Sequence, residues 1–317
     1  GSRADYDLLV SSRYTIAVGA VDYDGDWSSF SSPGASILIS APGRNIVSAD
    51  IPGEEGYSNE GELGSDFHVA AGTSASAPIV SGVIALMLEA NPLLGYRDVQ
   101  EILAYSAWQV DPSNDAWQFN GAQNWNGGGL RTHDIYGFGY IDALSAVRLA
   151  ETWTLSSTAA NEVSSSVTRT DDVAFVDGGT VTDTLTITNG VEIEYAVLDI
   201  DLEHTHLGDL IITLTSPDGT TSTLLNRAGK APNDPDDIGS TKVNLDFTLS
   251  SNEFWGETGI GDWILTVTDA RTGETGFLDK WTLTLYGDVL SDDDLYVYTD
   301  DFSRLTTEQD TTRAILT

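Results

Sequence analysis

The hydrophobic pattern of this chain changes its period once, about halfway along its 317 residues. Up to residue 153, short apolar runs alternate with segments in which apolar side chains recur every three or four positions, as in amphipathic helices. From about Asp172 to Gly287, apolar and polar residues alternate one by one, and no helical period competes with this strand pattern. The two patterns predict an α/β part followed by an all-β part.

The first part contains two strand-like runs, at 14–21 and 37–40, next to turn-forming residues. Helices are predicted over 74–90, 96–107 and 141–150, where apolar residues have helical spacing. In the second part, several short strands with turn signals between them favour a β-sandwich or jelly roll. The best-defined of these strands are Leu210 to Leu214, Val243 to Leu249, Trp263 to Val267, and Trp281 to Tyr286.

These patterns divide the chain into four segments. We predict a first domain over 1–153, a linker rich in Ser, Thr, Ala and Asn over 154–166, a β domain over 167–288 and an acidic tail over 289–317. The tail opens on three consecutive aspartates and resembles the entry to the calcium-binding RTX region of secreted bacterial proteins. A solvated acidic tail is an equally good interpretation.

The most specific motif is Gly72-Thr73-Ser74-Ala75-Ser76-Ala77-Pro78, directly before an apolar helix. A serine hydroxyl acts as a nucleophile only when it is exposed and has a base beside it. Ser74 would lie at the start of the helix, where free N–H groups favour negative charge on a carbonyl oxygen. Gly72 allows an unusual backbone conformation, and Pro78 is tolerated in the first helical turn. A serine N-cap of an ordinary helix is the alternative, but small residues on both sides favour the nucleophile.

This segment resembles the serine motif of the subtilisin superfamily, and other motifs resemble its kexin-like, proprotein-convertase-like branch. They follow in the expected order over most of the chain: Arg13-Tyr14-Thr15-Ile16-Ala17-Val18-Gly19-Ala20, Tyr96-Arg97-Asp98-Val99-Gln100, Tyr136-Gly137-Phe138-Gly139-Tyr140, and His204-Thr205-His206-Leu207-Gly208-Asp209-Leu210. The resemblance implies part of a three-layer α/β subtilisin-like peptidase domain with a parallel sheet. It also implies that the β domain is a P domain with a jelly-roll or sandwich fold.

The resemblance implies a serine endopeptidase in which Ser74 attacks the peptide carbonyl, a histidine moves the proton and an aspartate orients the histidine. Subtilisin-type chains carry these residues in the order Asp, His, Ser, but only 73 residues precede Ser74 here and none of them forms the expected Asp or His motif. None of the four histidines is a good candidate for the base. We therefore expect an N-terminally truncated sequence whose chain alone does not hydrolyse peptides.

Acidic residues line the pocket for a basic side chain in the kexin-like branch, and a nearby calcium ion supports that pocket. By resemblance, Asp7 and Thr73 would belong to the substrate pocket and Asp5 would be a calcium ligand. A third expected acid is replaced by Ser32, which weakens both the calcium site and a preference for paired basic residues. For Asp5 and Asp7, surface charge is an equal alternative.

The net charge of −35 and the absence of cysteine constrain partners and stabilisation. Such a chain is repelled by phosphate backbones and anionic lipid, and we expect no apolar run to approach the length of a membrane span. We therefore predict neither nucleic-acid binding nor membrane insertion. If the protein is secreted, carboxylate–calcium bonds would stabilise it in place of disulfides. With the protease resemblance, we predict a secreted or extracellular protein that contains structural calcium. The carboxylates of the β domain that could contribute are Asp199, Asp201, Asp209 and Asp218.

Two alternatives to a protease fragment with protein or peptide substrates remain open. The chain could be a non-catalytic protein- or surface-binding module that carries a degenerate protease remnant. Alternatively, the first half could complement the missing N-terminal part of the catalytic domain in trans. The intact surroundings of Ser74 favour the protease interpretation.

Overall fold

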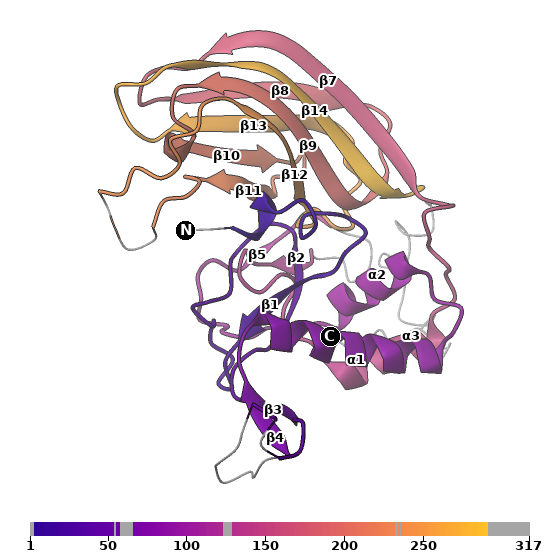
Figure 1. The fold of residues 1–317 in the computed structure, drawn as a ribbon. Helices are drawn as coiled ribbons and strands as arrows, with labels where there is room; N and C mark the ends of the chain where they lie inside the picture. Colours follow the sequence, from indigo (N-terminus) through magenta and orange to yellow (C-terminus); the bar gives the residue numbers. More distant parts are fainter. Residues whose placement is uncertain are drawn as a thin grey trace.

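The computed structural model describes residues 3–53, 55–57, 66–122, 129–231, 234 and 236–290. From residue 291 on, the predicted acidic tail lies outside the described residues. The described chain forms an α/β part, which holds the three helices, and a curved β-sandwich that packs on one side of it (Figure 1). The predicted succession of an α/β part and an all-β part is confirmed.

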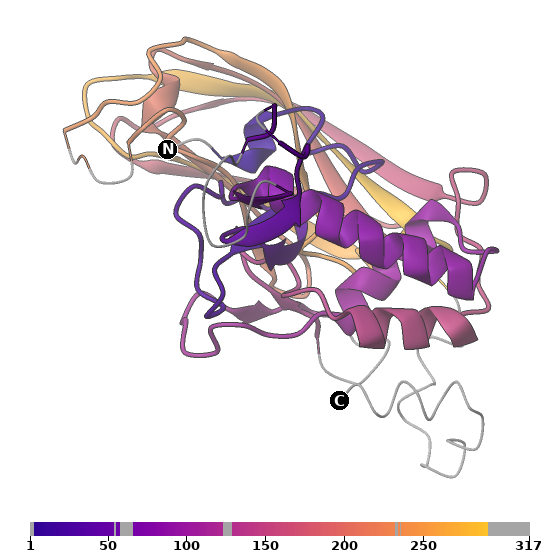
Figure 2. The ribbon, with the colours of Figure 1, turned by 60° about the horizontal axis from the view of Figure 1, so that its bottom comes forward.

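The α/β part is built on two parallel strands, β1 (Ala17–Val21) and β2 (Ile37–Pro42). Five of the six residues of β2 are buried, which explains why its run is almost continuously apolar. Helix α1 (Thr73–Ala90) packs against both strands, α3 (Ala143–Thr152) packs against α1, and α2 (Tyr96–Ser106) packs against β2 and α3. Figure 2 shows α1 and α3 lying side by side along their lengths. All five predicted elements are present, with ends shifted by zero to three residues.

Several short elements were not predicted from the sequence. A 3₁₀ turn, η1 (Ala4–Tyr6), lies near the N-terminus, and two strand pairs connect the larger elements. The members of these pairs are β3 (Ile46–Ala49) with β4 (Phe67–Ala70), and β5 (Gln118–Phe119) with β6 (Arg131–Thr132). The β3–β4 arm projects from the body of the molecule (Figure 1), and its side chains are mostly exposed, so it lacks the hydrophobic alternation that predicts a strand.

The β-sandwich consists of two four-stranded antiparallel sheets with the strand orders β11-β10-β13-β8 and β12-β9-β14-β7. Its strands are β7 (Val163–Ala174), β8 (Thr180–Ile187), β9 (Glu192–His204), β10 (Leu210–Thr215), β11 (Thr221–Asn226), β12 (Leu245–Ser251), β13 (Gly261–Asp269) and β14 (Gly276–Asp288), with the 3₁₀ turn η2 (Leu207–Asp209) before β10. Buried and exposed residues alternate along β8 without a break, as the one-by-one pattern predicted.

Strand β7 begins inside the segment that the sequence identified as a linker. Residues 163–166 pair with the end of β14, and the hydroxyls of Ser166 and Thr284 lie 2.9 Å apart. The outward face of β7 is rich in Ser and Thr, which is why its composition resembles that of a linker. The last four residues of the predicted linker, 163–166, therefore belong to the strand, because pairing with β14 outweighs composition.

The two parts share a core and buried polar contacts. Trp255, only 2 % exposed, packs its ring edge-on against Phe138 of the α/β part and Tyr195 of β9. Arg97 of α2 binds both carboxylate oxygens of Glu194 on β9 at 2.7 Å each. Its guanidinium also lies 2.8 Å from Asp288 at the end of β14. These contacts fix the sandwich against α2 and the segment around Phe138.

Candidate active site

Ser74 lies in the first turn of α1 with an exposed side chain. The residue before the helix, Gly72, has φ +129° and ψ 163° and caps the helix without a side-chain hydrogen bond. A side chain at Gly72 would bring its Cβ to 3.0 Å from the Ser74 Oγ. Glycine is therefore required both by the backbone conformation and by the space that the serine hydroxyl uses.

The end of β2 holds the start of α1 in place. The Gly72 N–H donates to the Gly43 carbonyl at 2.7 Å, and the Ser76 hydroxyl donates to the carbonyls of Ala41 and Pro42 at 3.2 and 3.0 Å. A Cβ on Gly43 would approach the Ser76 Oγ to 2.7 Å, so this contact also depends on a glycine. The serine hydroxyl is thus presented from a fixed backbone at a helix N-terminus, where the helix dipole and free N–H groups favour negative charge.

Helix α1 presents much of its surface to solvent although its sequence is strongly apolar. Only 28 % of its 18 residues are buried, and by length and composition it could span a membrane. The expectation that no apolar run approaches the length of a span is therefore wrong for α1. The core helix of a soluble domain passes the same test, and the exposed face of α1 is lined by small residues, among them Ala77, Ser81 and Ala85. Small side chains on an apolar helix allow a second element to pack closely.

The four histidines have contacts of other kinds. His68 on β4 packs against the ring of Tyr57 at 5.3 Å. The Nδ1 of His133 accepts a hydrogen bond from the Ile135 N–H at 2.9 Å, and burial lowers the pKa of His133. In the sandwich, the Nδ1 of His206 lies 2.9 Å from Asp209, and His204 contacts the backbone of His206. None of these contacts involves Ser74. The expectation that none of the four histidines is the base stays a prediction.

Asp7 and Thr73, the residues expected in the substrate pocket, are both exposed. Thr73 is the first residue of α1 and adjoins Ser74, which is consistent with a place in a substrate pocket. The Asp7 carboxylate accepts hydrogen bonds from the N–H groups of Leu9 and Val10 at 2.8 and 3.2 Å. It therefore stabilises its own turn, and its role in a pocket stays a prediction.

Asp5, the expected calcium ligand, is fully buried and already has partners for both oxygens. It pairs with Arg3 at 3.0 Å and accepts hydrogen bonds from the N–H groups of Ala35 and Ser36. Burial raises the pKa of Asp5, although the Arg3 guanidinium and the Ser36 hydrogen bonds act in the opposite direction. Within the described ranges, no group of three or more His, Cys, Asp and Glu side chains is arranged to hold a metal ion. Asp5 is therefore satisfied without a metal ion, because the Arg3 guanidinium is the cation beside it. The expectation of structural calcium stays a prediction.

Comparison with known proteins agrees with this architecture. Residues 2–139 match the model of the subtilase family, and residues 193–285 match that of the proprotein convertase P-domain. The chain is 28 % identical over 303 residues to Protease KEX1 of Kluyveromyces lactis, a match that covers 92 % of this chain and 36 % of that protein. It is 30 % identical over 318 residues to the Aeromonas extracellular serine protease of Aeromonas sobria, with 85 % of this chain and 50 % of that protein covered.

The crystal structure of the Aeromonas sobria serine protease in complex with a chaperone superimposes with a TM-score of 0.77 at 26 % identity, covering 91 % of this chain and 60 % of that chain. The chain belongs to the subtilase family of serine proteases. Because a P domain follows the peptidase part, it falls in the kexin-like branch, as its motifs predicted. The chain spans about a third to a half of the length of the two curated relatives described above.

Sequence reasoning missed the buried charged residues between the two parts. Arg97 of α2 pairs with Glu194 of β9 across the junction, and Glu253 of the sandwich lies near Arg3 and Asp134, which pair with each other within the α/β part. The composition, 14 Lys and Arg against 49 Asp and Glu, does not indicate which of these residues are buried. Charged residues are rarely buried unless they are paired, and these partners are distant in sequence.

Proposed function

We propose that this chain supplies the nucleophile and the P domain of a secreted serine endopeptidase that cleaves peptide bonds through an acyl-enzyme. The observation that carries the proposal is the exposed hydroxyl of Ser74 at the start of α1, held by Gly72 and by the end of β2. An extracellular location is supported by the name of the Aeromonas relative.

In the proposed reaction, the Ser74 Oγ forms a bond to the substrate carbonyl carbon as its proton passes to a base. The tetrahedral oxyanion is stabilised by N–H groups at the start of α1. Collapse of this intermediate breaks the carbon–nitrogen bond, and the base returns the proton to the leaving amine. Water then hydrolyses the ester by the reverse sequence and regenerates Ser74.

The base and the aspartate that orients it would come from the remainder of the peptidase domain. The exposed, apolar and small-residue face of α1 supports this, because it offers a helix surface on which further elements of the same domain can pack. We propose that the remainder of the domain covers this face. We also propose that the chain of 317 residues does not hydrolyse peptides without that remainder. Protein or peptide substrates follow from the family, whereas the preferred residue at the cleaved bond does not.

The experiment mixes the purified chain with a separately expressed N-terminal half of the peptidase domain and measures cleavage of a denatured protein substrate. We expect no cleavage by the chain alone, cleavage by the mixture, and loss of cleavage with Ser74→Ala. Ser113→Ala is the matched control because Ser113 is an exposed serine outside α1 whose hydroxyl bonds the Asp111 carboxylate. A mixture that stays inactive but forms a folded complex would overturn the protease interpretation in favour of a binding module.

A further inference from the structure

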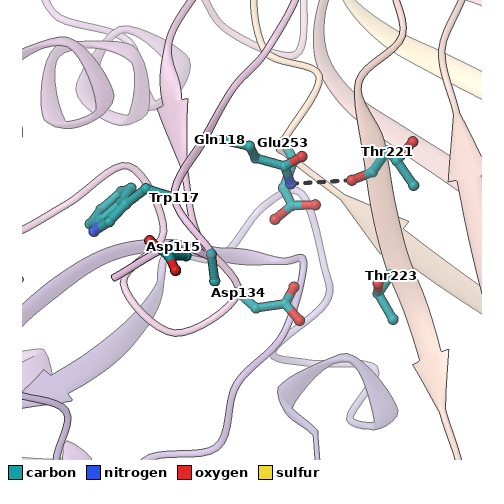
Figure 3. A pocket seen from close by; sticks show the side chains of 8 residues that line it. Asp115, Trp117, Gln118, Asp134, Thr221, Thr223 and Glu253 are labelled. Carbon is teal, nitrogen blue, oxygen red and sulfur yellow. Dashed lines mark hydrogen bonds between the residues drawn. The ribbon is translucent and has the colours of Figure 1, made fainter. Parts of the chain in front are cut away.

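A cavity of about 310 Å³ lies where the sandwich meets the α/β part, and the proposed catalytic chemistry does not use it. Its walls are formed by the segment Asp115–Gln118 and Asp134 from the α/β part, and by Thr221, Thr223 and Glu253 from the sandwich. Figure 3 shows Glu253, Asp134 and Thr223 around one space, with the Gln118 side chain bonded to the Thr221 carbonyl at 3.2 Å. The lining is dominated by oxygen acceptors.

Glu253 is the feature that points to a ligand. Its side chain is 3 % exposed, and within the described part of the chain its Oε2 has no hydrogen-bond partner. Its backbone is fixed, because the Asn120 side-chain amide donates to the carbonyls of Glu253 and Trp255 at 3.0 and 2.8 Å. A buried carboxylate oxygen without a donor is costly, so a cation or donor in the cavity would relieve that cost.

The charges around Glu253 are unbalanced. The groups that act on it are Arg3, Asp5 and Asp134 near the N-terminal segment, and the Ser222 hydroxyl on β11. The pKa of Glu253 is raised from 4.5 to about 8, chiefly by burial; the charges of Asp134 and Asp5 act in the same direction, and the Ser222 hydrogen bond and the Arg3 charge oppose them. Arg3 already pairs with Asp5 and with both oxygens of Asp134. The carboxylates around Glu253 therefore outnumber the cations.

The size of the cavity and the acceptor oxygens that line it favour a guanidinium over a metal ion. No compact group of three acidic or histidine ligands exists among the described residues, and 310 Å³ is far larger than one metal ion requires. A planar guanidinium, in contrast, has five donors in a fork that can reach two carboxylates at once. Arg3 shows this complementarity on one side of Asp134, whose carboxylate is still 34 % exposed.

We propose that this cavity binds a guanidinium cation, with Glu253 and Asp134 as its carboxylate acceptors and Asp115 at the rim. Free arginine and an arginine side chain of a peptide or protein offer the same chemistry. The site is separate from Ser74, so it would act as an additional recognition site at the junction of the two parts.

The test uses isothermal titration of the full chain with three short acetylated, amidated peptides that differ only in one central residue: arginine, lysine or citrulline. Citrulline has the shape of arginine without its charge. We expect the arginine peptide to bind at least about tenfold more tightly than the other two at pH 8.5, and more weakly at pH 6, where Glu253 holds a proton. Titration with free arginine separates the two sources: binding as tight as that of the peptide supports the cation alone, and weaker binding supports a peptide ligand.

Glu253→Gln should weaken binding of the arginine peptide about tenfold or more, and Asp115→Asn, at an exposed position where folding is not at risk, should weaken it by a smaller factor. Glu257→Gln is the matched control: Glu257 is also buried with an unpartnered Oε2 but does not line the cavity. Equal binding of the citrulline or lysine peptide, full binding by both Glu253→Gln and Asp115→Asn, no binding of any probe, or binding of calcium in place of arginine would each overturn the proposal.

Discussion

Replacement of Arg97 by methionine tests whether a buried ion pair holds the sandwich on the helices. Arg97 is 1 % exposed and forms an ion pair with Glu194, which is 7 % exposed. Removing one member of a buried pair costs about 3–5 kcal/mol, because the remaining carboxylate is left without compensation. For a chain of this size, such a loss lowers the melting temperature on the order of 10 °C.

The pH dependence of this loss makes the prediction sharper. Burial raises the pKa of Glu194 to about 7 from 4.5, although the Arg97 hydrogen bonds and charge lower it. A carboxyl whose pKa is raised by folding contributes stability that is complete below about pH 4.5 and is lost as the pH rises through about 7. Without Arg97 the pKa rises further, so the cost of Arg97→Met should be small at pH 5.5 and reach its full size near pH 9.

The assay is urea unfolding at pH 5.5 and pH 9, followed by tryptophan fluorescence. The matched variant is Arg97→Met combined with Glu194→Gln, which removes the uncompensated charge and should recover at least about half of the loss at pH 9. The reasoning is refuted if Arg97→Met lies within about 0.5 kcal/mol of the wild type at both pH values, a range typical of surface substitutions.

Two further predictions concern positions that the structure makes critical. Trp255→Ala should destabilise the chain by about 3–5 kcal/mol in the same unfolding assay, because it removes the buried ring that packs against both Phe138 and Tyr195. The control is Trp108→Ala, at a side chain that is 67 % exposed, which should change stability by less than about 1 kcal/mol. Gly72→Ala should cost about 1–3 kcal/mol and reduce the activity of the complemented protease, because of its φ of +129° and the 3.0 Å approach to the Ser74 Oγ. Its control is Gly82→Ala, where no atom lies within 4 Å of the new Cβ; a stability loss there as large as at Gly72 would contradict the argument.

The elements with a regular apolar pattern could be predicted closely. Helix α1 was expected from Ser74 and begins at Thr73, and β10 was expected from Leu210 and begins there. Elements whose pairing depends on a distant partner could not be predicted in the same way. Strand β7 was assigned in part to a linker because its Ser and Thr side chains become a strand face only when β14 lies beside it.

The candidate site was predicted to a similar extent. The location of Ser74 at a helix start follows from the local sequence, since Gly72, the small residues and the apolar run lie within a few positions of one another. The role of Asp5 did not follow from the sequence, because its partners Ala35 and Ser36 lie 30 and 31 residues away and Arg3 turns back onto it in the fold.

The sequence by itself determined the two-part architecture, the family and the position of the serine motif, because hydrophobic period and short motifs are encoded within a few neighbouring residues. Only the tertiary structure decided which charges are buried and what they contact. Arg97 meets Glu194 across 97 residues of sequence, and Arg3 meets Asp134 across 131. Burial and pairing depend on how distant segments pack together. For this reason the sequence does not distinguish Glu253 from the other acidic residues among the 49, whereas the structure shows that it is buried beside a cavity.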